Sequence, residues 1–576
     1  MPLATLIPMK LQTIRFRHFG SVMAGVVVLC ALMSPCFAVA QEFVRPPEPK
    51  DPPPKLSPPE PADEPPARPD LYGDALPEGA IARLGSLKSA GKDKPPRGHL
   101  ETVYLAVFSP DGKLVASRDH YQTIRVWEVD TGKTRWVLEG HEFRIRSMVF
   151  SPDSKLLVSA SWNEVVRLWD VATGREVRKL DGGGLIVQFS KDGKVLTVLH
   201  GEGKFSRYDV ATGKITSSSE VQGTKVPLAI SADGEYVAAT DKVADKIVGY
   251  AQLKKDAQRR LFKGAREYPT TACFSRDGMT LAAGGRDNLI HVWDVVTGKL
   301  NYQLEAHEAK ILQIAFSPDR SIIATASLDD TVRLWETISG TEIVTLSAHA
   351  RQAQTKGLQG NVCTVDFSPD GQRLVSGSAD RTLLVWDVNA VTSRDTLAPD
   401  SIDEAKLAKL WEDLADKDGR VGYRAKASLA GVGGRLAKFA TRELSGTLIE
   451  SKTDLITRLI EDLDSEEFIV REKATRQLLK LRGVADALLR KALVETNSQE
   501  TKFRIEKILR TNPPPVKIEL ADKLRMVRLV KALEQSGEKQ CVALLVTLSK
   551  SHPAPIIQGE ALRALGRLGH EVKKDE

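Results

Sequence analysis

Short segments that alternate apolar and polar residues fill the chain between about residues 76 and 392, and a different spacing follows. The segment Thr331–Trp335 (TVRLW) alternates with period two, the pattern of a half-buried strand. After residue 400, apolar residues recur three and four positions apart, as in Leu455, Ile456, Leu459, Ile460 and Leu463. This change predicts a β-rich region at residues 76–392 and an α-helical region at residues 401–576.

The β-rich region contains seven copies of one repeating unit. Each copy has a turn segment similar to Phe-Ser-Pro-Asp-Gly, at residues 108–112, 150–154, 189–193, 230–234, 274–278, 316–320 and 367–371. An aromatic residue follows 19 or 20 positions later: Trp127, Trp169, Tyr208, Tyr250, Trp293, Trp335 and Trp386. Asp-Gly pairs favour a turn between two strands, because Gly readily adopts positive φ. One four-stranded unit cannot bury both faces alone, so radial repetition into a propeller is predicted.

These motifs resemble the WD-repeat β-propeller family. The characteristic Gly-His position is occupied by Gly140-His141, Ala306-His307 and Ala348-His349, and the Trp-Asp dipeptide by Trp169-Asp170, Trp293-Asp294 and Trp386-Asp387. The resemblance implies seven blades, with the strand at 80–85 completing the last blade and closing the ring. Because the third and fourth repeats lack the His and carry Tyr in place of Trp, a six-bladed ring stays open as an alternative.

Two sets of residues could be mistaken for Ser-His-Asp catalytic triads. The resemblance implies instead that they form buried hydrogen-bond networks with the strand Trp, the first from His307, Ser327, Asp329 and Trp335 and the second from His349, Ser378, Asp380 and Trp386. Buried indole and imidazole nitrogens need such partners. No Gly-x-Ser-x-Gly nucleophile motif occurs. In the first two repeats, Tyr121 and Asn163 stand at the turn Asp position, which predicts decayed networks there.

The resemblance also implies that partners bind the face carrying the Gly-His loops and the Asp turns. The candidate residues on this face are Trp162, His120, Arg144, Arg286, Lys310 and Asn361. Trp and Arg are enriched in interface hot spots, although Trp162 could also pack on its own turn. Extra residues at 350–360 fall on the same face. The basic candidates favour an acidic partner.

The helical region resembles HEAT-like repeats. The pattern Val470-Arg471, Ala474 and Leu478 carries the likeness, and residues 559–565 repeat it. Pro513–Pro515 separates two helical groups. Together with the lead-in Leu76–Ala80 (LPEGA), the arrangement resembles a group of secreted bacterial WD-repeat proteins, which implies an architecture and no particular activity.

The N-terminus changes the interpretation of the net charge of +7. Basic residues, an apolar run at 19–33 and Ala38-Val39-Ala40 predict a signal peptide at residues 1–40, with an uncleaved membrane anchor as the alternative. Removing its three Lys and Arg residues lowers the net charge from +7 to +4, so nucleic acid is not expected as a partner. Twelve prolines among residues 46–69 predict a disordered spacer at 41–75.

Taken together, these features predict an exported, non-catalytic scaffold of the periplasm or cell envelope. The partner would be an unknown protein or envelope component, bound on the propeller and possibly on the helical region. After signal removal, Cys273, Cys363 and Cys541 remain, and they form no Cys/His cluster with zinc spacing. No metal or cofactor is therefore expected. A cell-wall or glycan-binding module and a propeller-based hydrolase remain as alternatives, and the oligomeric state stays open.

Overall fold

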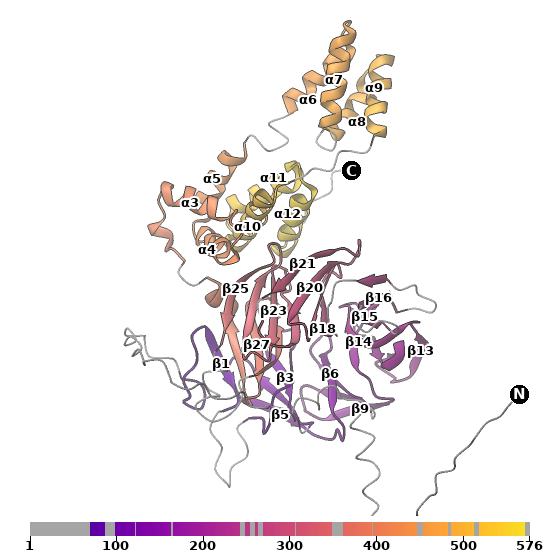
Figure 1. The fold of residues 1–576 in the computed structure, drawn as a ribbon, viewed down its shortest axis with the longest axis vertical. Helices are drawn as coiled ribbons and strands as arrows, with labels where there is room; N and C mark the ends of the chain where they lie inside the picture. The colour runs from indigo at the N-terminus through magenta and orange to yellow at the C-terminus, as the bar shows by residue number, and fades with distance from the viewer. Residues whose placement is uncertain are drawn as a thin grey trace, which may run out of the picture. The chain divides into compact units, whose positions relative to one another are not determined.

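Seven four-stranded antiparallel sheets make up the β-rich region (Figure 1). The structure is a computed structural model that describes residues 69–86, 98–120, 122–162, 165–241, 248–253, 260–262, 269–305, 307–347, 349, 361–393, 396–445, 453–481, 485–511 and 518–570. The expected signal peptide, most of the proline-rich spacer, Tyr121, Asn163 and residues 350–360 lie outside these ranges.

The sheets follow one another along the chain as blades 1 to 7. Blade 1 contains β2 (Leu105–Phe108), β3 (Leu114–Arg118), β4 (Ile124–Glu128) and β5 (Thr134–Leu138). Blade 2 contains β6 (Ile145–Phe150), β7 (Leu156–Ser161), β8 (Val165–Asp170) and β9 (Glu176–Asp181). Blade 3 contains β10 (Ile186–Phe189), β11 (Val195–Leu199), β12 (Lys204–Asp209) and β13 (Ile215–Glu220).

The later blades repeat this order. Blade 4 contains β14 (Thr224–Ile230), β15 (Tyr236–Asp241), β16 (Val248–Gln252) and β17 (Arg260–Phe262). Blade 5 contains β18 (Pro269–Phe274), β19 (Thr280–Gly285), β20 (Leu289–Asp294) and β21 (Leu300–Glu305). Blade 6 contains β22 (Ile311–Phe316), β23 (Ile322–Ser327), β24 (Val332–Glu336) and β25 (Thr341–Leu346). Blade 7 contains β26 (Val362–Phe367), β27 (Arg373–Ser378), β28 (Leu383–Asp387) and the early strand β1 (Ala80–Leu84).

Pairing between the first and last strands closes the ring. β1 runs antiparallel to β28, with Ala80 opposite Trp386 and Leu84 opposite Leu383. Leu84 also packs in one buried cluster with Trp127 of blade 1 and Val375 of blade 7. The predicted closure is therefore confirmed. The fourth repeat forms a complete sheet, so the six-bladed alternative is wrong.

The residues just before β1 correct the predicted spacer boundary. Residues 69–75 were expected to belong to the disordered segment, yet Pro69 forms a β-bridge with Ala75. The Asp70 carboxylate accepts a hydrogen bond from Arg83 Nε at 2.9 Å, with both side chains fully buried. This ion pair attaches the segment to β1, so ordered structure begins earlier than composition suggests.

Ten α-helices follow the propeller within the described residues. They are α3 (Glu404–Asp413), α4 (Gly419–Ala430), α5 (Gly433–Leu444), α6 (Thr453–Glu461), α7 (Phe468–Lys480), α8 (Asp486–Glu495), α9 (Gln499–Arg510), α10 (Leu520–Ser536), α11 (Lys539–Ser551) and α12 (Pro555–Arg567). A short helix, α2 (Val388–Thr392), precedes them. None of these helices is both long and apolar enough to cross a membrane.

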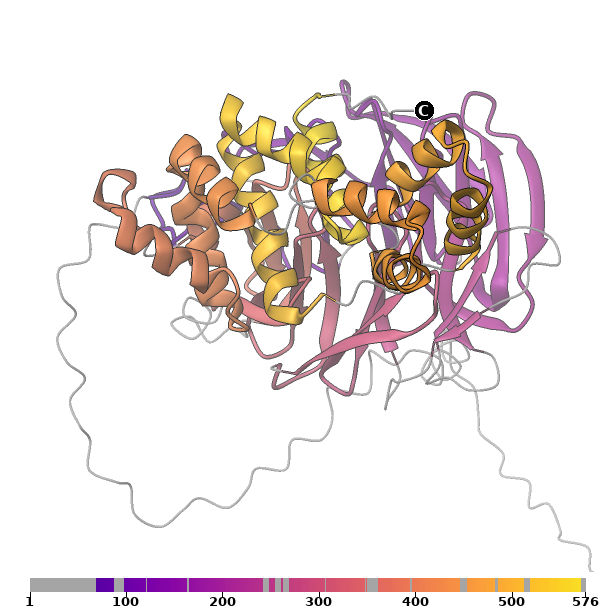
Figure 2. The ribbon, with the colours of Figure 1, turned by 90° about the horizontal axis from the view of Figure 1, so that it is seen from above.

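The helices form two groups with separate hydrophobic cores. One core joins α3–α5 to α10–α12, and Figure 2 shows the yellow C-terminal helices beside the orange α3–α5. The other core lies within α6–α9 and includes Ile456, Leu478 and Ile505. The second group is thus inserted in the chain between two halves of the first. Pro513–Pro515, expected to separate the groups, lies outside the described residues.

Candidate partner-binding sites

A buried hydrogen-bond network links the end of blade 6 to its turn. His307 Nδ1 lies 2.7 Å from Asp329 Oδ2, and His307 Nε2 lies 2.7 Å from Thr325 Oγ1. The Trp335 indole donates to the same Thr325 oxygen at 2.9 Å. Burial opposes ionisation of Asp329, but hydrogen bonds from His307 and Thr331 hold its pKa below the usual range.

The central hydroxyl of this network was predicted wrongly. Ser327 was expected to bridge His307 and Trp335, whereas the structure places Thr325 there. Ser327 ends β23, where its hydroxyl donates to the Ala309 carbonyl and accepts from the Asp329 backbone N–H. Side chains two positions apart share a strand face, so sequence spacing alone could not distinguish the two hydroxyls.

Blade 7 repeats the arrangement and the same correction. His349 lies 2.7 Å from Asp380 and 2.9 Å from Ser376 Oγ, which also accepts from Trp386 Nε1 at 2.9 Å. Ser376 therefore takes the place expected for Ser378. Burial opposes ionisation of Asp380, but the His349 imidazole lowers its pKa overall.

Blade 1 contains a third network that the sequence interpretation missed. His99 lies 3.1 Å from Asp119 and 2.7 Å from Ser117 Oγ, and Trp127 donates to Ser117 at 2.7 Å. Asp119 lies two positions after Ser117, whereas in blades 6 and 7 the acid lies four positions after the shared hydroxyl. The position four residues after Ser117 is Tyr121, so the acid of blade 1 was not recognised. The dipeptide Gly98-His99 was the signal that could have revealed it.

Blade 2 retains part of the same arrangement. His141 Nε2 lies 2.7 Å from Ser159 Oγ, which accepts from Trp169 Nε1 at 2.9 Å. Four blades thus have an imidazole and an indole tied to one hydroxyl. In each of these four blades, the hydrogen bonds lie at the end where the second strand terminates. We call this end of the propeller the top face.

The predicted candidates all lie in top-face segments. Trp162 directly follows β7 and is 46% exposed, and Arg286 follows β19 and is exposed. Lys310 and Asn361 are half-buried, and their carbonyls accept backbone hydrogen bonds from Leu328 and Ala379.

The structure brings two of the six candidates together around Tyr104. The His120 ring lies 6.1 Å from the Tyr104 ring, and the Arg144 guanidinium lies 4.8 Å from the centre of that ring. Arg118, which the sequence interpretation missed, lies 5.1 Å from the same centre.

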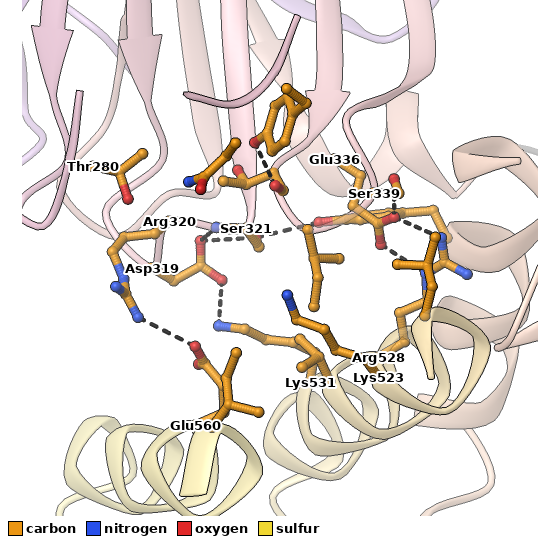
Figure 3. A pocket seen from close by; sticks show the side chains of 18 of the residues that line it. Thr280, Asp319, Arg320, Ser321, Glu336, Ser339, Lys523, Arg528, Lys531 and Glu560 are labelled. Atoms are coloured by element: carbon orange, nitrogen blue, oxygen red, sulfur yellow. Dashed lines mark hydrogen bonds and ion pairs between the residues drawn. The ribbon is translucent and has the colours of Figure 1, made fainter. Parts of the chain in front are cut away.

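A second candidate site is a pocket of about 570 Å³ between blade 6 and the helices (Figure 3). Glu336, at the end of β24, accepts two hydrogen bonds from Arg528 of α10. Asp319 accepts from Lys531 at 2.7 Å, and Glu560 of α12 accepts from Arg320 at 3.2 Å, as Figure 3 shows. Because Asp319 precedes β23 and Ser327 ends it, these contacts fall at the opposite end of the blade from the top face.

One lysine on the pocket wall has an unusual environment. The Lys426 ammonium lies 3.7 Å from the centre of the Tyr423 ring, and burial lowers the pKa of Lys426 to about 8. The Tyr423 hydroxyl donates to Ser321 Oγ at 3.2 Å, which links α4 to the propeller. Sequence spacing could not predict this site, because its residues come from segments about 100–240 positions apart.

The described residues include no group of three or more His, Cys, Asp or Glu side chains that could hold a metal ion. Cys273, Cys363 and Cys541 form no disulfide with one another. Burial raises the pKa of Cys273 to about 11, so this thiol is protonated at neutral pH.

Comparison with known proteins supports the repeat assignment. The family model "WD domain, G-beta repeat" matches residues 94–128, 132–170, 257–294, 298–336 and 340–387. The chain is 27% identical over 146 residues to Cross-pathway control WD-repeat protein 2 of Flammulina velutipes, which covers 25% of this chain and 46% of that protein. It is 28% identical over 139 residues to small ribosomal subunit protein RACK1z of Arabidopsis thaliana, covering 23% and 42%.

A third relative is Anaphase-promoting complex subunit cdh1 of Dictyostelium discoideum, 29% identical over 112 residues, covering 19% of this chain and 14% of the relative. The chain thus spans less than half the length of each of these relatives. The fold and the matches define a protein with WD40 repeats arranged as a seven-bladed β-propeller and extended by a helical region. The relatives are eukaryotic, so the resemblance to secreted bacterial proteins remains a prediction.

Proposed function

We propose that this protein is a non-catalytic scaffold whose propeller top face binds an acidic protein partner. WD40 propellers generally mediate protein–protein interactions. The observation that supports this use of the top face is the exposed Trp162 indole, three positions after Ser159, the hydroxyl of the blade 2 network. A binding face whose strands are already tied together loses less conformational entropy when a partner binds. Arg144, Arg286 and Lys310 supply positive charge on the same face.

The arrangement of the helices is compatible with this role. Their contacts with blade 6 lie at the end opposite the top face. Two of the relatives are a subunit of the anaphase-promoting complex and a protein of the small ribosomal subunit, both of which are parts of larger assemblies. We further propose that the HEAT-like helical region provides a second binding surface and that the protein acts in the cell envelope after export, as its N-terminus predicts.

In-cell crosslinking followed by mass spectrometry tests the scaffold role. Trp162→Ala should reduce partner capture at least tenfold without changing the melting temperature, because an exposed indole contributes little to the core. Val177→Ala is the matched control, since Val177 is 54% exposed on β9, away from the top face. Undiminished capture by Trp162→Ala would show that this indole is not an anchor.

A glycan of the cell wall is the second candidate ligand, and the exposure of Trp162 favours it, since an indole can stack on a sugar ring. Isolated cell wall should then retain the wild-type chain and release Trp162→Ala. Retention of both proteins, or of neither, would argue against glycan recognition by this residue.

A further inference from the structure

Arg118, at the end of β3, is a buried cation without a counterion in the described structure. Arg118 is only 6% exposed. The Nε and Nη1 atoms are buried and form no hydrogen bond with any residue that the structure describes. Arg83 and Arg528 are also buried, and each bonds a carboxylate, from Asp70 and Glu336 respectively. Arg118 differs from these two buried arginines in having no such carboxylate among the described residues.

The surroundings of Arg118 add positive charge. Its guanidinium lies 5.1 Å from the centre of the Tyr104 ring, and the Arg144 guanidinium lies 4.8 Å from the same centre. Arg146 of β6 also repels the Arg118 charge. Segments of two adjacent blades therefore direct cations to one aromatic ring.

The Tyr104 ring cannot fully replace the lost hydration. Cation–π contacts recover only part of the solvation that an ion loses on burial. Burial, together with repulsion from Arg144 and Arg146, lowers the pKa of Arg118 to about 9. The side chain therefore still carries its charge at neutral pH, and that charge requires an anion.

Among the described residues, the adjacent carboxylate does not provide one. Asp119 follows Arg118 directly, but its carboxylate bonds His99 in the blade 1 network. An anion from outside the chain would complete the site.

We propose that Arg118, Arg144 and Tyr104 form a receptor for an oxyanion, the carboxylate or phosphate group of the partner. A guanidinium matches such a group by forming two parallel hydrogen bonds. The link to a partner rests on the proposed function, whereas anion binding itself does not. The receptor would anchor the partner at the top face near blades 1 and 2.

The test uses the full chain and inorganic phosphate at constant ionic strength, with chloride as the reference anion. Phosphate should raise the wild-type melting temperature by several degrees, and calorimetry should detect saturable binding. Arg118→Met should abolish both effects. In chloride this variant should melt at or above the wild-type temperature, because it removes an uncompensated buried charge. Arg175→Gln, an exposed arginine before β9, is the control and should retain the response.

Several results would overturn the proposal. One is a lower melting temperature of Arg118→Met in chloride together with an undiminished response to phosphate. If Arg118→Met does not fold, Arg144→Gln decides the matter: phosphate affinity should fall at least tenfold, and an unchanged affinity refutes the site.

Two further arms identify the anion. Acetate and a hexaglutamate peptide replace phosphate in the same titration. A response to phosphate alone assigns a phosphate group, a response to the carboxylates assigns an acidic side chain, and no response to any of the three refutes the receptor. If Arg118→Met loses anion binding but still captures the crosslinked partner, the partner does not bind through this anion site. The Trp162→Ala experiment then tests the scaffold proposal independently.

Discussion

Replacing Arg528 with methionine should cost this protein much of its stability. The Arg528 side chain is almost completely buried between α10 and blade 6, where Nε and Nη2 donate to the two Glu336 oxygens at 2.7 and 2.5 Å. Its Nη1 donates to the carbonyls of Leu414 and Asp416 at 2.8 and 2.7 Å. Arg528→Met would leave the Glu336 carboxylate buried without a counterion and two carbonyls without this donor.

The expected loss can be estimated from these contacts. Removing one partner of a buried ion pair costs about 3–5 kcal/mol, much of it from the stranded charge. The carbonyls of Leu414 and Asp416, which lose their donor, add to this cost, although their penalty is not fully additive with that of the carboxylate. A destabilisation of about 4 kcal/mol corresponds to a drop of roughly 8–16 °C in melting temperature for a unit of 150–250 residues.

Urea unfolding followed by circular dichroism would measure the change in unfolding free energy. The double variant Glu336→Gln/Arg528→Met should recover a large part of the loss, because no ionised group is then buried alone. Arg525→Met is the matched control, since Arg525 lies on the same helix but pairs with the exposed Glu412, and such surface pairs contribute about 0–1 kcal/mol. A loss below about 1 kcal/mol for Arg528→Met, or no recovery in the double variant, would refute this reasoning.

Three other substitutions test the networks and the pocket. Thr325→Val removes the oxygen shared by His307 and Trp335 and should destabilise the chain by about 1–3 kcal/mol in urea unfolding, and a smaller effect would argue against its central position. Because the folded-state pKa of Asp380 is lowered, its charge stabilises the fold above the unfolded pKa. The stability gap between wild type and Asp380→Asn should therefore hold near neutrality and shrink as the pH falls below about 4, and a pH-independent gap would contradict this assignment. The pKa of Lys426 is lowered to about 8, so its charge opposes folding most strongly below pH 8. Lys426→Met should stabilise the chain by about 1 kcal/mol at pH 7, a value reduced because the side chain is partly exposed. In urea unfolding, this gain in unfolding free energy should disappear as the pH rises from about 8 to 10.5.

The propeller was predictable from sequence because its determinants are local. The Asp-Gly turns, the period-two strands and the aromatic residue of each repeat lie within about 20 positions of one another. Closure by β1 followed from the missing strand in the last repeat. Thr325 was missed because Ser327, two positions further along the same strand, offers an equivalent hydroxyl. Asp119 was missed because Tyr121 stands at the position expected for the acid, and only three-dimensional distances identify the residue that bonds His99.

The interfaces were not predictable for a different reason. Helical spacing shows which face of α10 is apolar but not that this face packs against α4 and α5. The pair Arg528–Glu336 joins residues 192 positions apart. Nothing local in the sequence marks Arg118 as a buried arginine whose Nε and Nη1 have no hydrogen-bond partner among the described residues. Sequence patterns record local periodicity, whereas burial of an unpaired charge depends on the assembled structure.

The insertion of α6–α9 has a consequence for the order of events during synthesis. The core begun by α3–α5 is completed by α10–α12, and the 75 residues that separate Leu444 from Leu520 must be made in between. At about 5–20 residues per second, the ribosome needs roughly 4–15 s for this stretch. The apolar faces of α3–α5 are exposed throughout that interval, while α6–α9 can already assemble a core of their own. A stalled ribosome in this stretch would therefore leave a finished β-ring attached to half a helical core, a substrate for chaperones rather than a shorter working protein.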